Sequence, residues 1–193
     1  LVRNNVMQLF EALGQLPGLD ELTLTTNASQ LARLATKLKA SGVKRINISL
    51  DSLDPERFRK LTRVGDLSKV LDGIDAALQA GFERIKLNAV ILKNRNEDEI
   101  LDLVGFAADR GMDFSFIEEM PLGSNDDHDR AEAYYSSDQV RRDIEQGFSL
   151  TPTTETTGGP SKYFRIEGTQ SRVGFISPHS HNFCEACNRV RVT

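Results

Sequence analysis

The fold of this chain is decided by an alternating stretch, Ile46-Asn47-Ile48-Ser49-Leu50-Asp51. Successive side chains of a β-strand point to opposite faces, so Asn47, Ser49 and Asp51 share one face and the apolar residues share the other. Buried strands of an ordinary parallel sheet are apolar on both faces. This stretch therefore predicts a sheet with one apolar face and one polar face.

Two neighbouring stretches repeat the same alternation. Residues 22–27 place three polar side chains on one face: Thr23, Thr25 and Asn27. Residues 85–88 place two there, Lys86 and Asn88. A fourth strand, predicted at 113–119, has both apolar and polar residues on one face. A curved sheet or barrel whose lumen binds a polar ligand explains this pattern best, because parallel sheets are rarely left uncovered. A flat sheet with one wet side is the alternative.

A helix, a glycine and then a strand recur through residues 1–120. The predicted strands follow glycines at 43–50, 85–92 and 113–119. Asp54-Pro55 is predicted to open a short helix, and Asn96 with Glu99 is typical of a capping box. Alternating strands and helices indicate a parallel sheet of the α/β class.

The composition changes after Pro121. An acidic loop at 123–129 is followed by a predicted helix at 137–146, a Thr/Pro/Gly-rich loop and two predicted antiparallel strands at 162–167 and 172–176. We therefore expect two domains, a partial (β/α) TIM-type barrel over residues 1–122 and a small α+β extension over residues 123–193.

The composition is that of a globular protein. The chain has 193 residues, of which 39% are apolar and 27% charged, and a formal net charge of −4. It has no long basic run, so we expect no nucleic-acid partner. No segment approaches the length of a membrane span, and the first residues do not resemble a signal peptide. With a single CxxC pair, these features favour a cytoplasmic protein.

The two cysteines of the chain, Cys184 and Cys187, lie three residues apart. Two thiolates at this spacing can bind one metal ion or one iron of a cluster. Half of a zinc site and a surface disulfide are the alternatives. His179 and His181 lie close in sequence and could complete a metal site.

A pair of arginines, Arg189 and Arg191, follows the cysteines with Val190 between them. On an extended segment they would present two guanidinium groups on one face, a bidentate clamp for phosphate or carboxylate. Exposed strand residues are the alternative.

Lys86 lies in the middle of a predicted strand, on its polar face. It could be a structural ion-pair partner, a phosphate ligand, or a Schiff-base nucleophile of the aldolase type. Thr25 and Ser49 could bind a ligand or satisfy backbone groups. Met120 could contact a ligand or pack in the core.

Five motifs occur in a fixed order: Thr25-Thr26-Asn27, Ile48 to Asp54, Lys86 to Val90, Phe116 to Gly123, and Phe183-Cys184-x-x-Cys187 followed by Asn188 to Arg191. Together they closely resemble the GTP 3′,8-cyclase family of radical S-adenosylmethionine enzymes, which opens molybdenum cofactor biosynthesis. The similarity extends over nearly the whole chain.

The resemblance implies a radical S-adenosylmethionine barrel that lacks its first strands. Thr25, Lys86 and the stretch Arg189-Val190-Arg191 match family contacts to GTP, and Ser49 and Met120 match contacts to S-adenosylmethionine. Cys184 and Cys187 match two of three ligands of a second 4Fe–4S cluster, whose open iron would hold the guanine base.

The chemistry implied by the resemblance begins at another 4Fe–4S cluster. That cluster would cleave S-adenosylmethionine to a 5′-deoxyadenosyl radical, which takes hydrogen from C3′ of GTP. The carbon radical would then attack C8 of guanine. A homodimer, an electron donor and the next enzyme of the pathway are the further partners considered for the complete protein.

The chain also departs from the family pattern. The CxxxCxxC motif for the radical-generating cluster and the glycine-rich segment that contacts S-adenosylmethionine are absent from residues 1–193, and so is a third cysteine for the second cluster. Asn27-Ala28 replaces the usual Asn-Gly. We therefore expect an internal fragment that holds no catalytic residue and does not catalyse the reaction by itself.

Overall fold

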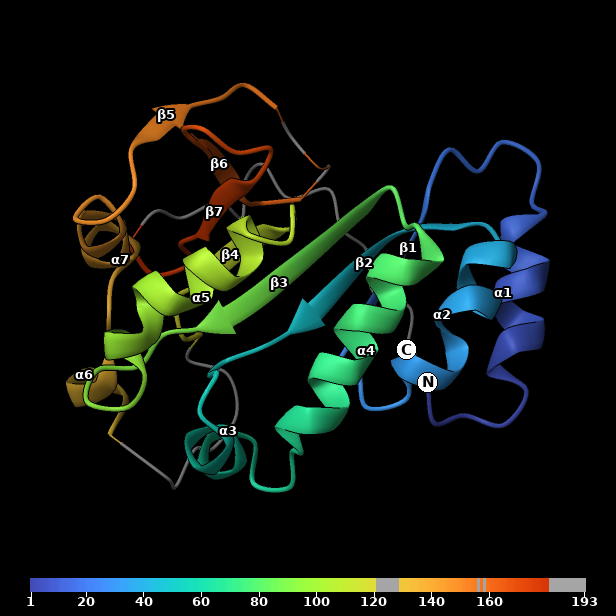
Figure 1. The fold of residues 1–193 in the computed structure, drawn as a ribbon, viewed down its shortest axis with the longest axis horizontal. Coiled ribbons are helices and arrows are strands. Elements are labelled where there is room, and N and C mark those ends of the chain that lie inside the picture. The colour runs from blue at the N-terminus through green and yellow to red at the C-terminus, as the bar shows by residue number, and fades with distance from the viewer. Residues whose placement is uncertain (121–128, 156, 158, 181–193) are drawn as a thin grey trace. The chain divides into compact units, whose positions relative to one another are not determined.

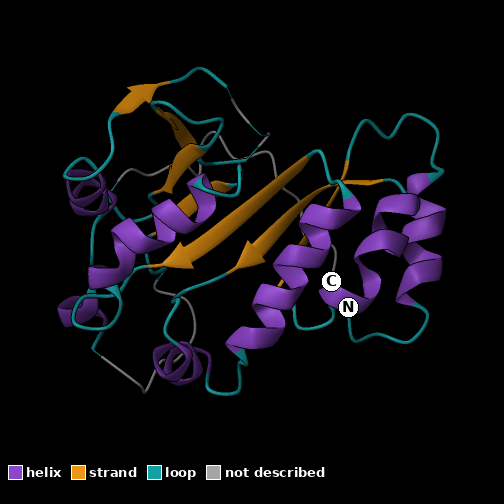
Figure 2. Cartoon of the chain, in the orientation of Figure 1, coloured by secondary structure: helices purple, strands orange, loops and turns teal. Residues whose placement is uncertain are grey.

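The computed structural model describes residues 1–120, 129–155, 157 and 159–180. The chain divides into two compact units, Leu1–Asn88 and Ala89–Thr193. Figure 1 labels their elements, and Figure 2 distinguishes helices from strands. Both units contain helices and strands, so the chain is a mixed α/β protein, as the sequence predicted. The expected boundary between residues 122 and 123 lies outside the described residues and stays a prediction.

The first unit begins with α1 (Val6–Gly14) and then alternates strands with helices. Its strands are parallel and hydrogen-bonded in the order β1 (Leu22–Thr26), β2 (Val43–Ser49) and β3 (Arg84–Val90), the last of which continues two residues into the second unit. Its other helices are α2 (Leu31–Ala40), α3 (Pro55–Thr62) and α4 (Leu67–Ala80). The predicted parallel sheet is confirmed.

The alternation of polar and apolar residues sets the two faces of this sheet. Ile46, Ile48 and Leu87 are completely buried, whereas Asn47 and Ser49 on the opposite face are half-buried. Each buried apolar side chain stabilises the fold by about 1.5–3 kcal/mol relative to an exposed one. The apolar set faces the core, and the polar set stays accessible.

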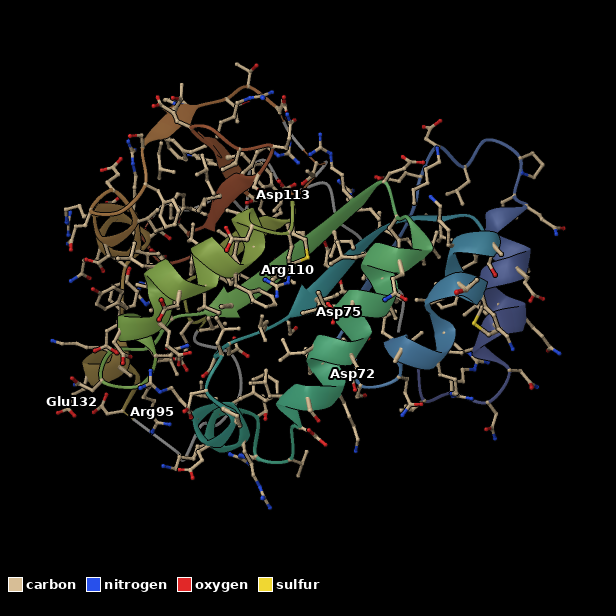
Figure 3. The ribbon with its side chains drawn as sticks, viewed as in Figure 1. Asp72, Asp75, Arg95, Arg110, Asp113 and Glu132 are labelled. Atoms are coloured by element: carbon tan, nitrogen blue, oxygen red, sulfur yellow. The ribbon has the colours of Figure 1, made fainter. Side chains whose placement is uncertain are left out.

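Two amphipathic helices, α2 and α4, pack against each other in this unit (Figure 1). A Cβ at Gly73 of α4 would lie 2.7 Å from the carbonyl oxygen of Ala28, so only glycine permits this close approach. The exposed face of α4 carries Asp72 and Asp75 (Figure 3). Helical periodicity thus separates the buried stripe from the charged one.

Local signals decide where several helices begin. Asp54 accepts a hydrogen bond from the backbone N–H of Arg57 at 2.7 Å, which confirms that Pro55 opens α3. The capping box predicted at Asn96 is wrong. The Asn96 side chain instead accepts from the N–H of Leu92 at 2.8 Å and donates to the carbonyl of Val90 at 3.0 Å. It therefore stabilises the turn after β3 rather than the helix that follows.

The second unit combines parallel and antiparallel pairing. Its strands are ordered β4 (Asp113–Ile117), β7 (Arg172–Ile176), β6 (Lys162–Ile166) and β5 (Leu150–Pro152). β4 and β7 are parallel, whereas β7 with β6 and β6 with β5 are antiparallel. The antiparallel pairing of β6 and β7 confirms the prediction for residues 162–167 and 172–176.

Among its described residues, the second unit also has four short helices: the 3₁₀ turn Glu97–Glu99, α5 (Ile100–Ala108), α6 (Arg130–Ala133) and α7 (Ser137–Ile144). The buried rings of Phe114 and Phe116 lie 4.7 Å apart and anchor its core. None of the helices in the described part of the chain has the length and apolar character needed to cross a membrane.

Candidate functional site

The strand register of the first unit brings together three side chains that the sequence predicted to bind ligands. Thr25 of β1 lies opposite Asn47 of β2, and Asn47 lies opposite Lys86 of β3. Ser49 lies two residues beyond Asn47, opposite Asn88. Because neighbouring strands are about 4.8 Å apart and residues two apart share a face, Thr25, Ser49 and Lys86 form one group.

Two of these side chains, Thr25 and Ser49, lie at the carboxyl ends of their strands, and the strand register places Lys86 level with Thr25. Thr25 is the last residue but one of β1, Ser49 is the last of β2, and Lys86 is the third of the seven residues of β3. Thr25 is exposed, and the other two are half-buried. In α/β sheets and (β/α) barrels, ligands bind at the carboxyl ends of parallel strands. The group therefore occupies a position where a ligand can reach it.

Two asparagines on this face have buried acceptors that remain open. The Nδ2 of Asn47 donates to the Oγ1 of Thr25 at 3.3 Å. The Oδ1 atoms of Asn47 and Asn88 are buried and accept no hydrogen bond within the described residues. An unsatisfied buried acceptor costs about 1–3 kcal/mol. Both atoms are therefore acceptors that the described residues leave without a donor.

Asn47 and Asn88 were not among the predicted site residues. The alternation had already placed them on the polar face, and the signal that could have found them is the same one that found Lys86. What the sequence could not show is that their side-chain oxygens are buried without partners.

The loop after β2 fixes Ser49 at the edge of the group. The N–H of Leu50 donates to the carbonyl of Asn88 at 2.9 Å, which continues the pairing of β2 and β3 by one residue. The hydroxyl of Ser52 then accepts from the N–H of Asp54 at 3.0 Å. Ser49 is therefore held by ordered backbone on both sides.

Met120 belongs to the second unit and follows β4. Its side chain is 45% exposed, so it is not a core residue of the described structure. The prediction that it contacts the same ligand as Ser49 stays a prediction.

The C-terminal motif lies outside the described residues. This applies to Cys184, Cys187 and the stretch Arg189-Val190-Arg191, as well as to His181. His179 is described, and its ring lies 5.1 Å from the ring of Tyr134. Within the described ranges, no three His, Cys, Asp or Glu side chains are grouped so that they could hold a metal ion.

A second polar cluster surrounds Glu118, directly after β4. Glu118 is 2% exposed, and its Oε1 accepts from the N–H of Ser137 at 2.8 Å and from the hydroxyl of Ser180 at 2.6 Å. Its Oε2 accepts from the N–H groups of His179 and Ser180, each at 3.0 Å. Burial alone would raise the pKa of Glu118, but these donors outweigh it and lower the pKa to about 2.

Two tyrosines next to this cluster are hard to ionise. Burial, followed by the charge of Glu118, raises the pKa of Tyr134. Burial and a 2.5 Å hydrogen bond from its hydroxyl to Asp143 raise the pKa of Tyr135 to about 12. Both phenols are therefore neutral near pH 7, and each keeps a proton that it can donate in a hydrogen bond.

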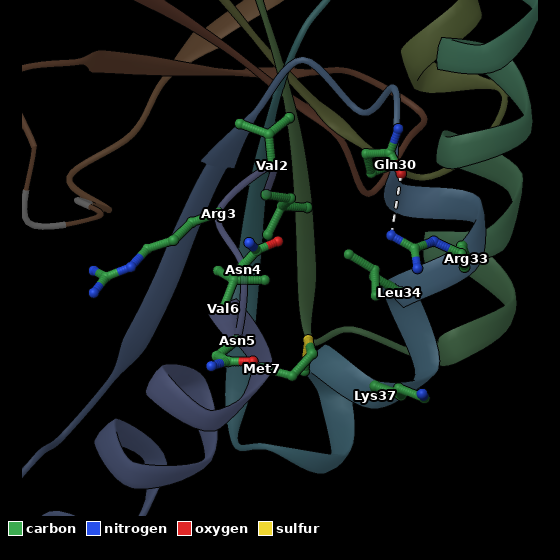
Figure 4. A pocket seen from close by; sticks show the side chains of 11 residues that line it. Val2, Arg3, Asn4, Asn5, Val6, Met7, Gln30, Arg33, Leu34 and Lys37 are labelled. Carbon is green, nitrogen blue, oxygen red and sulfur yellow. Dashed lines mark hydrogen bonds between the residues drawn. The ribbon is translucent and has the colours of Figure 1, made fainter.

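A pocket of about 450 Å³ lies elsewhere in the first unit, between residues 1–7 and α2 (Figure 4). Its lining includes three cationic side chains: Arg3, Arg33 and Lys37. The Oε1 of Gln30 accepts from Arg33 at 3.2 Å across its rim. The pocket shares no residue with the group on the polar face of the sheet.

Two family models match this chain. One, described as the Radical SAM superfamily, matches residues 1–107. The other, described as Molybdenum Cofactor Synthesis C, matches residues 112–193. Together they account for almost every residue.

Curated relatives match over the whole chain. A GTP 3′,8-cyclase of Ectopseudomonas mendocina is 59% identical and one of Pseudomonas syringae is 60% identical, each covering 100% of this chain. A GTP 3′,8-cyclase of Saccharophagus degradans is 55% identical over the same extent. The chain spans 58% of the length of each of these relatives.

Proposed function

The chain belongs to the radical SAM superfamily, and from this premise we propose that the protein containing it is a GTP 3′,8-cyclase. Such an enzyme converts GTP to 3′,8-cyclo-7,8-dihydro-GTP in molybdenum cofactor biosynthesis. Relatives of that name are 55% to 60% identical over the full chain. The match of residues 112–193 to a molybdenum cofactor synthesis family supports the same pathway.

The observation that carries the proposal is the polar group on β1, β2 and β3. A hydroxyl from Thr25, a cation from Lys86 and a hydroxyl from Ser49 lie on one face of three parallel strands, with Thr25 and Ser49 at the carboxyl ends. The open acceptors of Asn47 and Asn88 add sites for N–H or O–H donors. This donor and acceptor set suits a nucleotide, which carries phosphates, ribose hydroxyls and a base with amino groups.

Each predicted residue has a role that its chemistry supports. Lys86, Arg189 and Arg191 would offset the triphosphate charge of GTP, because charge-assisted hydrogen bonds to phosphate are strong. Thr25 and the stretch with Val190 would contact the rest of the nucleotide. Ser49 would bind a polar group of S-adenosylmethionine, and Met120 would offer apolar surface to its adenosyl part.

Cys184 and Cys187 would supply two ligands of a 4Fe–4S cluster, since cysteine thiolates hold such clusters. With two cysteines, the chain has no ligand set for a separate radical-generating cluster, so we expect no activity from it alone. When bound in the protein, the clusters and S-adenosylmethionine supply the radical that takes hydrogen from GTP.

The proposal includes the finer architecture. Residues 1–122 would form a partial (β/α) barrel and residues 123–193 an extension that carries the cysteines and arginines. The polar face toward the carboxyl ends of β1–β3 supports a ligand-binding lumen. A cytoplasmic location, a second copy, an electron donor and the next pathway enzyme complete the expected setting.

The proposal is tested with the protein that contains this chain, isolated without oxygen. We expect bound iron and sulfide, reductive cleavage of S-adenosylmethionine and binding of GTP. Lys86→Ala should weaken GTP binding about tenfold or more, because a charge-assisted contact is lost, and leave S-adenosylmethionine binding within about twofold. Lys69→Ala, which removes an exposed lysine from α4, is the control with the same charge change.

Three results would contradict the proposal. Stoichiometric zinc without brown absorbance would favour an anion-binding module with a zinc-type CxxC site. Borohydride trapping of Lys86 with a carbonyl substrate would favour Schiff-base chemistry. Equal losses of affinity for GTP and for S-adenosylmethionine in Lys86→Ala would show that Lys86 is not a specific GTP contact.

A further inference from the structure

The carboxylate of Glu118 joins three separate parts of the second unit. Glu118 follows β4, and its own N–H donates to the carbonyl of Ile176 at the end of β7 at 3.0 Å. Ser137, whose N–H it accepts, is the first residue of α7. His179 and Ser180 lie in the segment that leaves β7. The Glu118 side chain therefore links the end of β4 to the start of α7 and to the segment that follows β7.

Further contacts support the same junction. The hydroxyl of Ser177 donates to the hydroxyl of Ser137 at 2.7 Å, and both residues are buried. The first N–H groups of a helix have no partner within it and favour negative charge, which suits a carboxylate at the start of α7. The segment 177–180 is thus fixed against α7 by side-chain bonds at both of its ends.

We propose that Glu118 is a positioning residue that fixes the start of the C-terminal stretch bearing Cys184, Cys187, Arg189 and Arg191. The consequence for GTP rests on the proposed function, whereas the anchoring of residues 179 and 180 does not. Cys184 follows Ser180 by four residues, which span at most about 14 Å when fully extended. Where Ser180 is held therefore limits where the first thiolate can lie.

Only a carboxylate suits this junction. Four donors converge on Glu118, and its two oxygens accept two hydrogen bonds each without donating any. Glutamine has the same shape, but it would present an NH₂ group to one pair of donors. Glu118→Gln therefore removes the hydrogen bonds from one pair of donors with almost no change in side-chain volume.

The test compares three variants of the protein that contains this chain. Glu118→Gln removes the hydrogen bonds from one pair of donors, and Ser180→Ala removes only the hydroxyl donor, so it leaves the backbone bonds intact. Glu132→Gln is the control, because it makes the same change at an exposed glutamate of α6. Hydrogen exchange reports the N–H groups of His179 and Ser180, and titrations report affinities for GTP and S-adenosylmethionine.

In Glu118→Gln we expect these two N–H groups to exchange at least about tenfold faster, since each loses a charge-assisted bond. GTP affinity should fall about tenfold while S-adenosylmethionine affinity stays within about twofold. The reason is that the arginines and cysteines of the C-terminal stretch are proposed to bind GTP and not S-adenosylmethionine. Ser180→Ala should give a smaller change of the same kind. Glu132→Gln should leave both exchange rates and both affinities close to those of the unmodified protein.

Unchanged exchange at His179 and Ser180 in Glu118→Gln would overturn the anchor. Faster exchange with unchanged GTP affinity would overturn the positioning role. If the unmodified protein binds no GTP, the proposed function fails, and the exchange rates still decide whether Glu118 is the anchor.

Discussion

β4 carries a buried carboxylate at each end, and the two are held in opposite ways. Asp113, at the start of the strand, is 4% exposed and pairs with Arg172 through a 2.6 Å bond between Oδ2 and Nη2. Glu118, just beyond the other end, is 2% exposed and accepts hydrogen bonds from neutral N–H and O–H donors. The carboxylate of Asp113 is thus paired with a cation, whereas the carboxylate of Glu118 is stabilised by the dipoles of neutral N–H and O–H groups.

The Asp113 end has the features of a structural site. Arg172 also binds Glu155 at 2.8 Å, and its guanidinium lies 4.7 Å from the ring centroid of Tyr163. Burial opposes the charge of Arg172, but the bonds and charge of Asp113 outweigh it and raise its pKa. In (β/α) folds the amino ends of strands serve stability and the carboxyl ends serve function, and the proposed role of Glu118 would give the two ends of β4 that same division.

The largest effect is expected from Arg172→Met. The change leaves the carboxylate of Asp113 buried without its cation, which costs about 3–5 kcal/mol of unfolding free energy. Urea unfolding measures it. The double variant Arg172→Met with Asp113→Leu should recover a large part of the loss, because no buried charge is left unpaired. A loss below about 1 kcal/mol in the single variant would mean that the ion pair does not stabilise this end.

A smaller, pH-dependent effect is expected from Glu118→Gln. The pKa of Glu118 falls from 4.5 to about 2 on folding, so its ionised form contributes about 3 kcal/mol at neutral pH. Because the folded pKa is the lower one, this contribution is present above pH 4.5 and is lost as the pH falls toward 2. The unfolding free energies of the two proteins should therefore converge over that window. A constant difference from pH 7 to pH 3 would show that the carboxylate charge is not what stabilises the junction.

The smallest effect on stability is expected from Asn88→Ala in the first unit. Its Oδ1 is buried without a hydrogen-bond partner in the described structure, so removing the amide should lower the unfolding free energy by no more than about 0.5 kcal/mol, because relief of the unsatisfied acceptor offsets the lost packing. The affinity for GTP should fall about fivefold to tenfold, since a donor group of the nucleotide loses its acceptor. Asn4→Ala, at an exposed asparagine outside this group, is the matched control. A marked loss of stability in Asn88→Ala would assign this residue to the fold rather than to the ligand.

Much of the first unit could be predicted from the sequence. The alternation around Ile46 and Ile48 set the buried face of β2, and the same pattern placed Thr25, Ser49 and Lys86 on one face. Asp54-Pro55 marked the start of α3 correctly. The error at Asn96 has a physical cause, because an asparagine side chain can stabilise a turn as well as a helix start, and only the buried turn at Val90 and Leu92 decided between them.

Sequence alone therefore determined which side chains share a face and where several helices begin, because these properties depend on neighbouring residues. The tertiary structure alone decided which charges meet. Asp113 and Arg172 are 59 residues apart, and Glu118 and Ser180 are 62 apart. Both pairs exist because β4 and β7 are adjacent in the sheet, and strand order is set by packing over the whole unit rather than by any local pattern.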